Sequence, residues 1–185
     1  MRRLQTSRAL GRRRGVGGVV AIALLVVVGA CARPAAHDPP AAGVTDSVTG
    51  SVTLQRTGCF GRCPEYSVRV GSDGGVRFIG RSNVAVPNES TASVPAADAQ
   101  RLLEQFADAG FFTLDSTYVA GKPTCRFHAT DLPSAMLDVT IGARSHRVLW
   151  DTGCSDAPAA LAQLANRVDS VAVTARWIGS TPRSP

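Results

Sequence analysis

The sequence predicts an α+β domain in which an antiparallel sheet of about five or six strands carries two helices on one face. Two observations indicate this class. Short segments with alternating apolar residues resemble strands, whereas two longer segments carry apolar residues at helical spacing. Their order is three strands, a helix, two or three strands and a second helix. An antiparallel sheet with helices on one face closes that order most simply.

The first half of the domain supplies three strands and a helix. Apolar and polar residues alternate in 51–55, 66–70 and 76–81, and a glycine-rich turn joins the second segment to the third. Pro95 then begins a helix, because proline suits the first turn. Gly110 ends that helix in a C-cap position, where glycine accepts a left-handed conformation.

The second half repeats this pattern on a smaller scale. Residues 137–141 and 147–150 alternate as strands, and Gly142-Ala143 is a two-residue hairpin turn between them. We expect Asp156 to cap the second helix, whose apolar stripe lies within 160–168.

The positive charge of the chain is concentrated at its beginning. Six of the twenty basic residues are arginines within residues 2–14, and no acidic residue precedes Asp38. Without residues 1–30, fourteen basic residues face fourteen acidic ones, so the remaining chain is neutral. Nucleic-acid binding therefore loses its electrostatic support.

Residues 1–30 have the layout of a signal peptide. An arginine-rich head precedes the apolar run Val16–Val28, which is shorter than the ~20 residues of a membrane span. Val28-Gly29-Ala30-Cys31 resembles the lipobox of bacterial lipoproteins, in which the cysteine receives a diacylglyceryl group and the chain is cut just before it. We therefore expect lipidation of Cys31 by several acyl chains, which anchor a protein stably. An ordinary secretory signal and a transmembrane anchor are the alternatives.

The expected organisation is a signal peptide (1–30), the lipidated cysteine with a Pro/Ala-rich tether (31–49), the folded domain (50–177) and a flexible tail (178–185). The lipid places the protein at a membrane of the cell envelope. Ala32 is not the aspartate that retains some lipoproteins at the inner membrane, so the outer membrane facing the periplasm is favoured.

Four cysteines remain after Cys31. An even number in an exported domain predicts two disulfides. On the chain-entropy estimate, a Cys59–Cys63 bond contributes about 2 kcal/mol and a Cys125–Cys154 bond about 3.6, whereas the crossed pair Cys59–Cys154 would contribute about 4.7. The energies alone leave the pairing open.

Redox and metal chemistry are the alternatives for these cysteines. Redox-active thiols usually lie in Cys-x-x-Cys at a helix N-terminus, whereas Cys59 and Cys63 have three residues between them and a hairpin context. A zinc site could combine these two with Cys125 and either His128 or Cys154. The sequence lacks the paired Cys-x-x-Cys ligands of common zinc sites, so we expect disulfides and no metal.

No other residues form a recognisable catalytic motif. Asp151-Thr152-Gly153 follows an apolar strand, as in aspartic proteases, but a single copy would require a homodimer to pair two aspartates. His128 and His146 have no partner at a known spacing. We expect no cofactor. Whether the protein is an enzyme stays open, and a non-catalytic binding role is favoured.

The run Arg-Thr-Gly-Cys-Phe-Gly-Arg-Cys-Pro-Glu-Tyr at 56–66 resembles the hallmark of a bacterial domain family of unknown function, whose members often follow lipoprotein signals. The resemblance covers about residues 50–177. Its other features are an Asp-Gly turn, a Gly-Phe-Phe segment after a helix, an Asp-x-Pro segment and a late tryptophan, here Asp73-Gly74, Gly110–Phe112, Asp131-Leu132-Pro133 and Trp177. The resemblance implies a fold and a location in the cell envelope, but no activity.

The resemblance also bears on the disulfides. Cys59 and Cys63 belong to the family motif and Cys125 and Cys154 do not, which implies the pairs 59–63 and 125–154. Gly61 lets the short loop turn back without strain. The sequence thus predicts a monomeric, lipid-anchored envelope protein with a small non-catalytic binding or structural domain of unknown ligand. The alternative is a periplasmic thiol-redox enzyme that uses Cys59 and Cys63.

Overall fold

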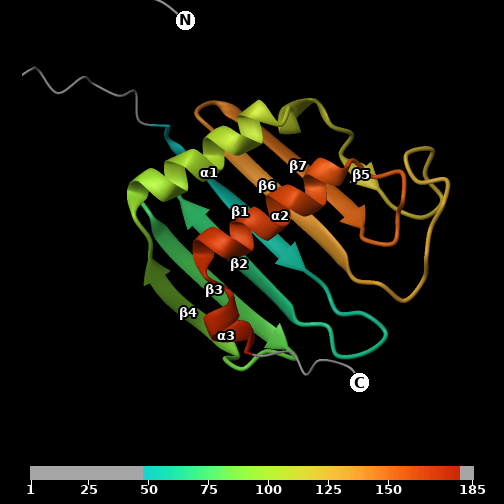
Figure 1. Cartoon of the computed structure of the whole chain (residues 1–185), viewed down its shortest axis with the longest axis horizontal. Helices are drawn as coiled ribbons and strands as arrows, with labels where there is room; N and C mark the ends of the chain where they lie inside the picture. The colour runs from blue at the N-terminus through green and yellow to red at the C-terminus, as the bar shows by residue number, and fades with distance from the viewer. Residues whose placement is uncertain (1–47, 180–185) are drawn as a thin grey trace, which may run out of the picture. The chain divides into compact units, whose positions relative to one another are not determined.

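The computed structural model describes residues 48–179, which form a seven-stranded sheet and its helices (Figure 1). The expected signal peptide, Cys31 and all but the last two residues of the expected tether lie outside the described residues. So does the chain from residue 180 onward.

The elements follow one another in the order predicted for an α+β domain. In chain order they are β1 (Gly50–Arg56), β2 (Glu65–Gly71), β3 (Gly75–Ser82), β4 (Asn88–Ser93), α1 (Ala96–Asp108), the 3-10 helix η1 (Phe111–Thr113), β5 (Thr117–Tyr118), β6 (Ser134–Ile141), β7 (Arg144–Asp151), α2 (Ala159–Ala172) and α3 (Ala175–Ile178). The predicted fold class is confirmed. The strand count is higher than predicted, and β4, η1 and α3 are the elements that were not predicted.

The sheet has the strand order β4-β3-β2-β1-β6-β7-β5, with β1 at its centre. Every neighbouring pair is antiparallel except β5 and β7, which run parallel over two residues. The turn between β6 and β7 contains Gly142 at φ 57°, and Ala143 after it keeps a negative φ. That combination agrees with the predicted Gly-X hairpin turn.

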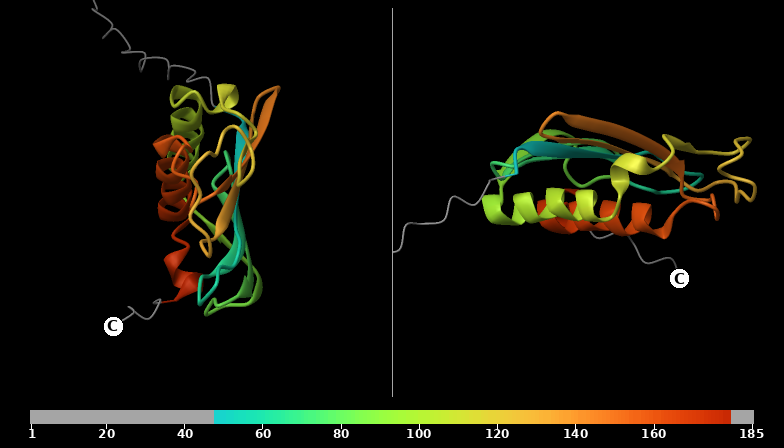
Figure 2. Two further views of the ribbon diagram at one scale, coloured as in Figure 1. Left: turned by 90° about the vertical axis from the view of Figure 1, so that its right-hand side faces the viewer. Right: turned by 90° about the horizontal axis from the view of Figure 1, so that it is seen from above.

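The helices cover one face of the sheet (Figure 2). In α1 the buried residues recur at helical spacing and face the alternate apolar residues of the central strands. Beyond α1, Gly110 has φ 68°, as predicted for a C-cap glycine, and Phe111 folds back to meet Phe106 edge to face with ring centres 5.2 Å apart. No helix within residues 48–179 is long and apolar enough to cross a membrane.

The short helix α3 attaches the end of the domain to β3 and to the segment between β3 and β4. Trp177 stacks on Phe78 with ring centres 4.8 Å apart, and its backbone oxygen accepts a hydrogen bond from the Val86 amide. Trp177 is therefore part of the hydrophobic core, with 7% of its surface exposed. A helix of four residues is too short to show a periodic pattern, which is why the sequence did not predict it.

The predicted helix cap at Asp156 is wrong. Helix α2 begins at Ala159, and Pro158 before it forms no side-chain cap. The preceding proline supplies the extended conformation at which a helix can start. Asp156 instead bonds to a neighbouring loop, which belongs to the site described below.

Candidate functional site

Three loops meet at one end of the sheet, and both disulfides lie in them. The sheet register aligns the end of β1 with the start of β2 and of β6, and Ser134 at the start of β6 lies opposite Asp151 at the end of β7. Loops 57–64, 119–133 and 152–158 therefore leave the sheet together. We call these three loops the disulfide end.

The first loop connects β1 to β2 and is closed by its own disulfide. Cys59 and Cys63 are bonded with their Cα atoms 5.5 Å apart, and Gly61 between them has φ 146°, a conformation that glycine adopts readily. The Phe60 amide donates to the backbone oxygen of Asp131, 3.2 Å away, so this loop also contacts the second loop. These cysteines connect two strands and do not themselves begin a helix, which is the usual position of a reactive thiol.

The second disulfide joins the other two loops. Cys125 and Cys154 are bonded and are 4% and 6% exposed, so the sulfur atoms are buried beneath the loops. The bonds 59–63 and 125–154 are the pairs that the family resemblance implied. Around them His128 and Cys154 form an isolated antiparallel bridge, and the Ala129 amide donates to Gly153.

Asp156 fixes the second loop through its carboxylate rather than capping α2. One oxygen accepts the backbone amides of Arg126 and Phe127 at 2.7 and 3.2 Å, and the other accepts the Arg126 guanidinium at 3.1 Å. The Arg126 amide bond, opposed in part by desolvation and helped by the Phe127 amide, lowers the pKa of Asp156. Asp156 therefore stays ionised in mild acid and continues to hold the loop.

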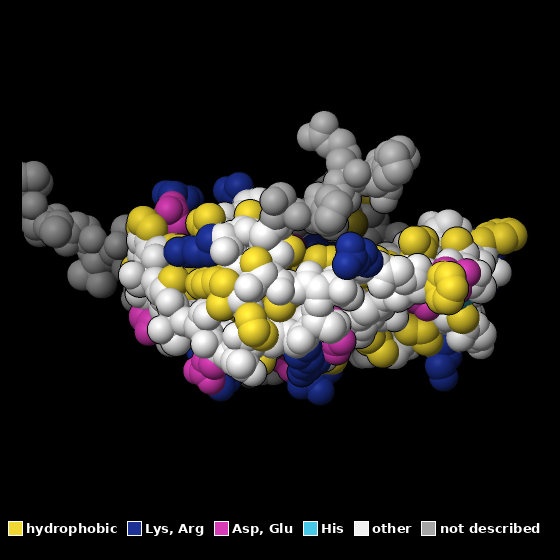
Figure 3. Space-filling view, turned by 90° about the horizontal axis from the view of Figure 1, so that it is seen from below, with side chains coloured by type: hydrophobic (Ala, Val, Ile, Leu, Met, Phe, Trp, Pro, Cys, Tyr) yellow, Lys and Arg dark blue, Asp and Glu magenta, His cyan; other side chains and the backbone are white. Residues whose placement is uncertain are grey.

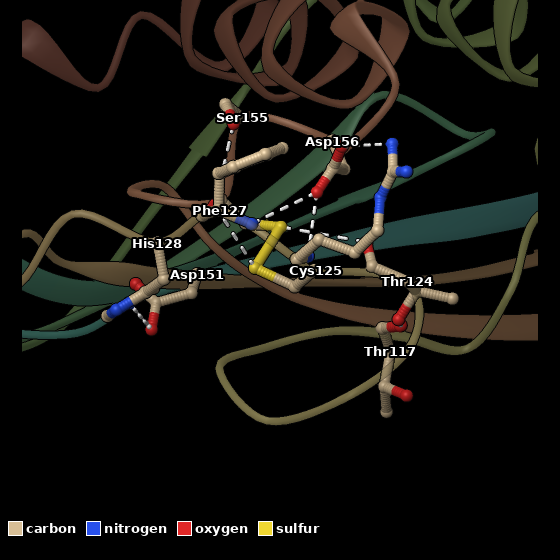
Figure 4. The surroundings of a disulfide bond; sticks show 10 residues. Thr117, Thr124, Cys125, Phe127, His128, Asp151, Ser155 and Asp156 are labelled. Carbon is tan, nitrogen blue, oxygen red and sulfur yellow. Dashed lines mark hydrogen bonds and ion pairs between the residues drawn. A yellow bond between two sulfur atoms is a disulfide. The ribbon is translucent and has the colours of Figure 1, made fainter.

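His128 and Asp151 face each other beside the buried disulfide (Figure 4). His128 Nε2 lies 2.7 Å from Asp151 Oδ2, while Asp151 Oδ1 is buried and has no hydrogen-bond partner in the described part of the chain. The triplet that suggested a protease thus presents its carboxylate to a histidine rather than to a second aspartate.

This pair has the geometry of a base and its orienting group. Among residues 48–179, however, no hydroxyl or thiol bonds to the other ring nitrogen of His128, so the nucleophile of a triad has no counterpart here. The zinc site weighed as an alternative for the cysteines is likewise not assembled, since no three His, Cys, Asp or Glu side chains of that range are placed to hold a metal ion.

The pairing of His128 with Asp151, which lie 23 positions apart, was not predicted from the sequence. One signal could have revealed it. His128 follows Cys125 by three residues, and Asp151 precedes Cys154 by three. The bond between Cys125 and Cys154 therefore brings the side chains of His128 and Asp151 close together. The other histidine among residues 48–179, His146, lies away from this site and hydrogen-bonds to the backbone oxygen of Leu114 at 2.9 Å.

Large hydrophobic side chains project from the disulfide end. Phe60 is 89% exposed, Phe127 66% and Leu132 50%, and they belong to the first two loops. Figure 3 shows hydrophobic side chains standing out at this end, at the right of the view. Arg126 lies 5.9 Å from the Phe127 ring centre, so a cation accompanies the aromatic surface.

A polar network fixes the base of the first loop to the helix layer. Arg56 from β1 and Tyr66 from β2 both donate to the carboxylate of Asp169 on α2, at 2.8 Å from the Arg56 guanidinium and 2.7 Å from the Tyr66 hydroxyl. Burial, the Asp169 charge and the hydrogen bond raise the pKa of Tyr66 well above its usual range, although Arg56 opposes this. Burial alone would lower the pKa of Arg56, but Asp169 and Tyr66 more than offset that effect and raise it.

The family model described as Domain of unknown function (DUF6438) matches residues 50–172. The chain belongs to this family. No curated protein matches the chain. The DUF6438 match ends with α2, so α3 and its buried Trp177 lie beyond the matched residues.

The DUF6438 match contains all three loops of the disulfide end and the network at its base. Within it, Phe60 of the cysteine loop contacts Asp131 of the Asp-Leu-Pro segment through the backbone. Asp131 has φ 69°, a left-handed conformation that aspartate tolerates better than most residues. Two sequence features that lie some 70 positions apart thus form one connected surface.

Proposed function

We propose that this DUF6438 protein is a lipid-anchored protein of the cell envelope whose domain binds a protein partner through the disulfide end. The observation that carries the proposal is the exposure of Phe60 and Phe127 on cross-linked loops. Each loop is held by a disulfide and by backbone hydrogen bonds. Aromatic side chains exposed on fixed loops are typical of binding surfaces, where they supply most of the binding energy.

The position of this surface agrees with an anchor at Cys31. The described chain begins at Val48 and enters β1 at Gly50, whereas the disulfide end begins where β1 finishes at Arg56. The exposed aromatic residues therefore lie at the end of the sheet opposite to the entry of the tether. A domain held through that entry leaves Phe60 and Phe127 accessible to another protein.

The anchor is tested by replacing Cys31 with serine in the full chain. We expect the wild-type protein in the membrane fraction, with a mature mass that begins at an acylated Cys31, and the Cys31→Ser protein outside that fraction. An unacylated wild-type chain that retains residues 1–30 would contradict the proposed anchor.

The binding surface is tested separately by photo-crosslinking in intact cells. A photoreactive residue at position 127 should trap one protein of defined mass, and adding Phe60→Ser should weaken that capture. Burying one phenylalanine contributes about 1.5–3 kcal/mol, so we expect roughly a ten- to hundredfold loss of affinity. Position 101, on the exposed side of α1, is the control. Equal labelling from positions 127 and 101 would refute the disulfide end as the binding surface, whatever the result for Cys31.

A further inference from the structure

The two edge strands of the sheet differ in length and in pairing. One edge is β5, which has two residues and pairs parallel with β7. The other edge is β4, a strand of six residues that pairs with β3 without a register shift, although its first residue, Asn88, has φ 67°. An edge strand presents unpaired amide and carbonyl groups to solvent. The β4 edge is therefore the longer open hydrogen-bonding surface of the two.

The hydrogen-bond pattern identifies which groups of β4 point outward. The Val94 amide donates to the Gly74 oxygen at 2.9 Å. Because the direction of these groups alternates along an antiparallel strand, Ala92 and Ser90 also bond to β3. The backbone groups of Glu89, Thr91 and Ser93 then point away from the sheet. Within residues 48–179 no turn, loop or side chain bonds to them.

The usual protections of an edge are weak in β4. The strand contains no lysine, no proline and no bulge. Its one charged side chain, Glu89, is held by two bonds from Arg77 of β3, at 2.8 and 2.7 Å. Natural edge strands that avoid pairing use those devices or a much shorter strand. In the part of the chain that the structure describes, β4 is therefore open to an added strand.

We propose that β4 pairs antiparallel with β4 of a second copy of this chain, about a two-fold axis at Thr91. Pro87 and Pro95 flank the strand and carry no N–H. The outward donors are therefore those of Glu89, Thr91 and Ser93. With Thr91 on the axis, Thr91 lies opposite Thr91 of the second copy, and Glu89 lies opposite Ser93. All three outward amides of each copy then face outward carbonyl groups of the other. Shifting the axis by one residue leaves only two facing donors on each copy.

Charge and side-chain size favour the same arrangement. In this register the two Glu89 side chains are four residues apart along the pair, about 13 Å, which exceeds the Debye length at physiological salt. The residues of β4 other than Asn88 and Glu89 are serine, threonine and alanine, so the strand offers no pocket for the large side chains of an unrelated peptide. A second β4 has the small side chains that fit.

Pairing of one strand buries less surface than the roughly 1,000 Å² of stable complexes. We therefore expect a weak dimer that a covalent trap can detect. It would replace the monomer that the sequence suggested. The inference concerns an edge of the sheet and does not depend on the binding role of the disulfide end.

The test introduces Thr91→Cys into the full chain in its own membrane, followed by mild oxidation. Residues opposite each other in a hydrogen-bonded pair have Cα atoms about 5.5 Å apart, which suits a disulfide. We expect a disulfide-linked dimer of twice the mass of the chain. Ser93→Cys is the matched control on the same face of the same strand, and it should give no dimer because its two copies lie about 13 Å apart.

A second pair of variants uses no new cysteine. Thr91→Pro removes an outward amide but no bond to β3, as edge prolines do, whereas Thr91→Ala keeps the amide. In sedimentation of the full chain at high concentration, Thr91→Ala should associate and Thr91→Pro should remain monomeric. The proposal is overturned if Thr91→Cys gives no dimer, if Ser93→Cys cross-links equally well, or if Thr91→Cys links to a protein of another mass.

Discussion

Replacing Asp169 with alanine should destabilise the domain more than any substitution of a surface ion pair. The carboxylate accepts bonds from the Tyr66 hydroxyl, from two nitrogens of Arg56 and from the Thr174 hydroxyl, at 2.7 to 3.1 Å. The side chains of Arg56 and Asp169 are 22% and 20% exposed, and Tyr66 is 2% exposed. Alanine would leave a largely buried cation and a buried hydroxyl without their acceptor.

The expected magnitude follows from the burial. Removing one partner of a fully buried ion pair costs about 3–5 kcal/mol. Because a fifth of each charged side chain reaches water and Asn166 still accepts one bond from Arg56, we expect a loss of about 2–4 kcal/mol. Tyr66→Phe removes only the hydroxyl and keeps the stacked ring, so its cost should be about 1–2 kcal/mol.

The assay is urea unfolding of the purified protein, with a midpoint for each variant. A loss of that size should lower the midpoint by roughly 1–2 M. Asp138→Ala is the control, since Asp138 pairs with Arg147 on the open face of the sheet and should cost less than about 1 kcal/mol. If Asp169→Ala and Asp138→Ala shift the midpoint equally, the network does not hold the loop as inferred.

Three further predictions concern the disulfides, the pH dependence and a close backbone contact. Under limiting reductant the 59–63 disulfide should be reduced before the 125–154 disulfide, whose cysteines are buried. Mapping of alkylated cysteines by mass would show this, and the opposite order would count against the structure. The pKa of Tyr66 is raised in the folded state. Its contribution to the free energy of unfolding is therefore complete below about pH 10, the unfolded value, and declines above that pH. For one titrating group, the free energy of unfolding changes by at most about 1.4 kcal/mol per pH unit. Urea unfolding at pH 9 and 11 should therefore show a smaller loss in Tyr66→Phe than in the wild type, and equal losses would exclude this cause. Finally, Gly153→Ala would place its Cβ 2.1 Å from the Ala129 oxygen, which should cost about 1–3 kcal/mol. An unchanged urea midpoint would show that the two loops separate easily.

The strands and helices that the sequence predicted are those whose pattern reports burial on one face. Segment 66–70 alternates because β2 has one face on the core and one on solvent. The segment that became β4 has no such alternation, since Asn-Glu-Ser-Thr-Ala-Ser is polar or small throughout. Its strand conformation comes from pairing with β3 and not from burying a hydrophobic face.

Only part of the candidate site was predicted, because the sequence reports local features better than distant contacts. The loop around Cys59 and Cys63 is local, so its glycine and cysteine spacing predicted a loop between two strands, whereas its disulfide pairing was implied by the family resemblance. Asp156 was misassigned because an aspartate near a helix start resembles a cap, whereas the competing amides of Arg126 and Phe127 come from a distant part of the chain. The sequence near Asp156 carries no signal for these two partners, because only tertiary contact brings them to its carboxylate.

The sequence by itself determined the α+β class, the position of the cysteine-rich loop and the glycine cap of the first helix, because hydrophobic periodicity and glycine conformation act over a few residues. The tertiary structure decided which groups meet: His128 with Asp151, Arg56 and Tyr66 with Asp169, and the exposed Phe60 and Phe127 at one end. These depend on the register of strands far apart in the chain, which many local interactions fix together.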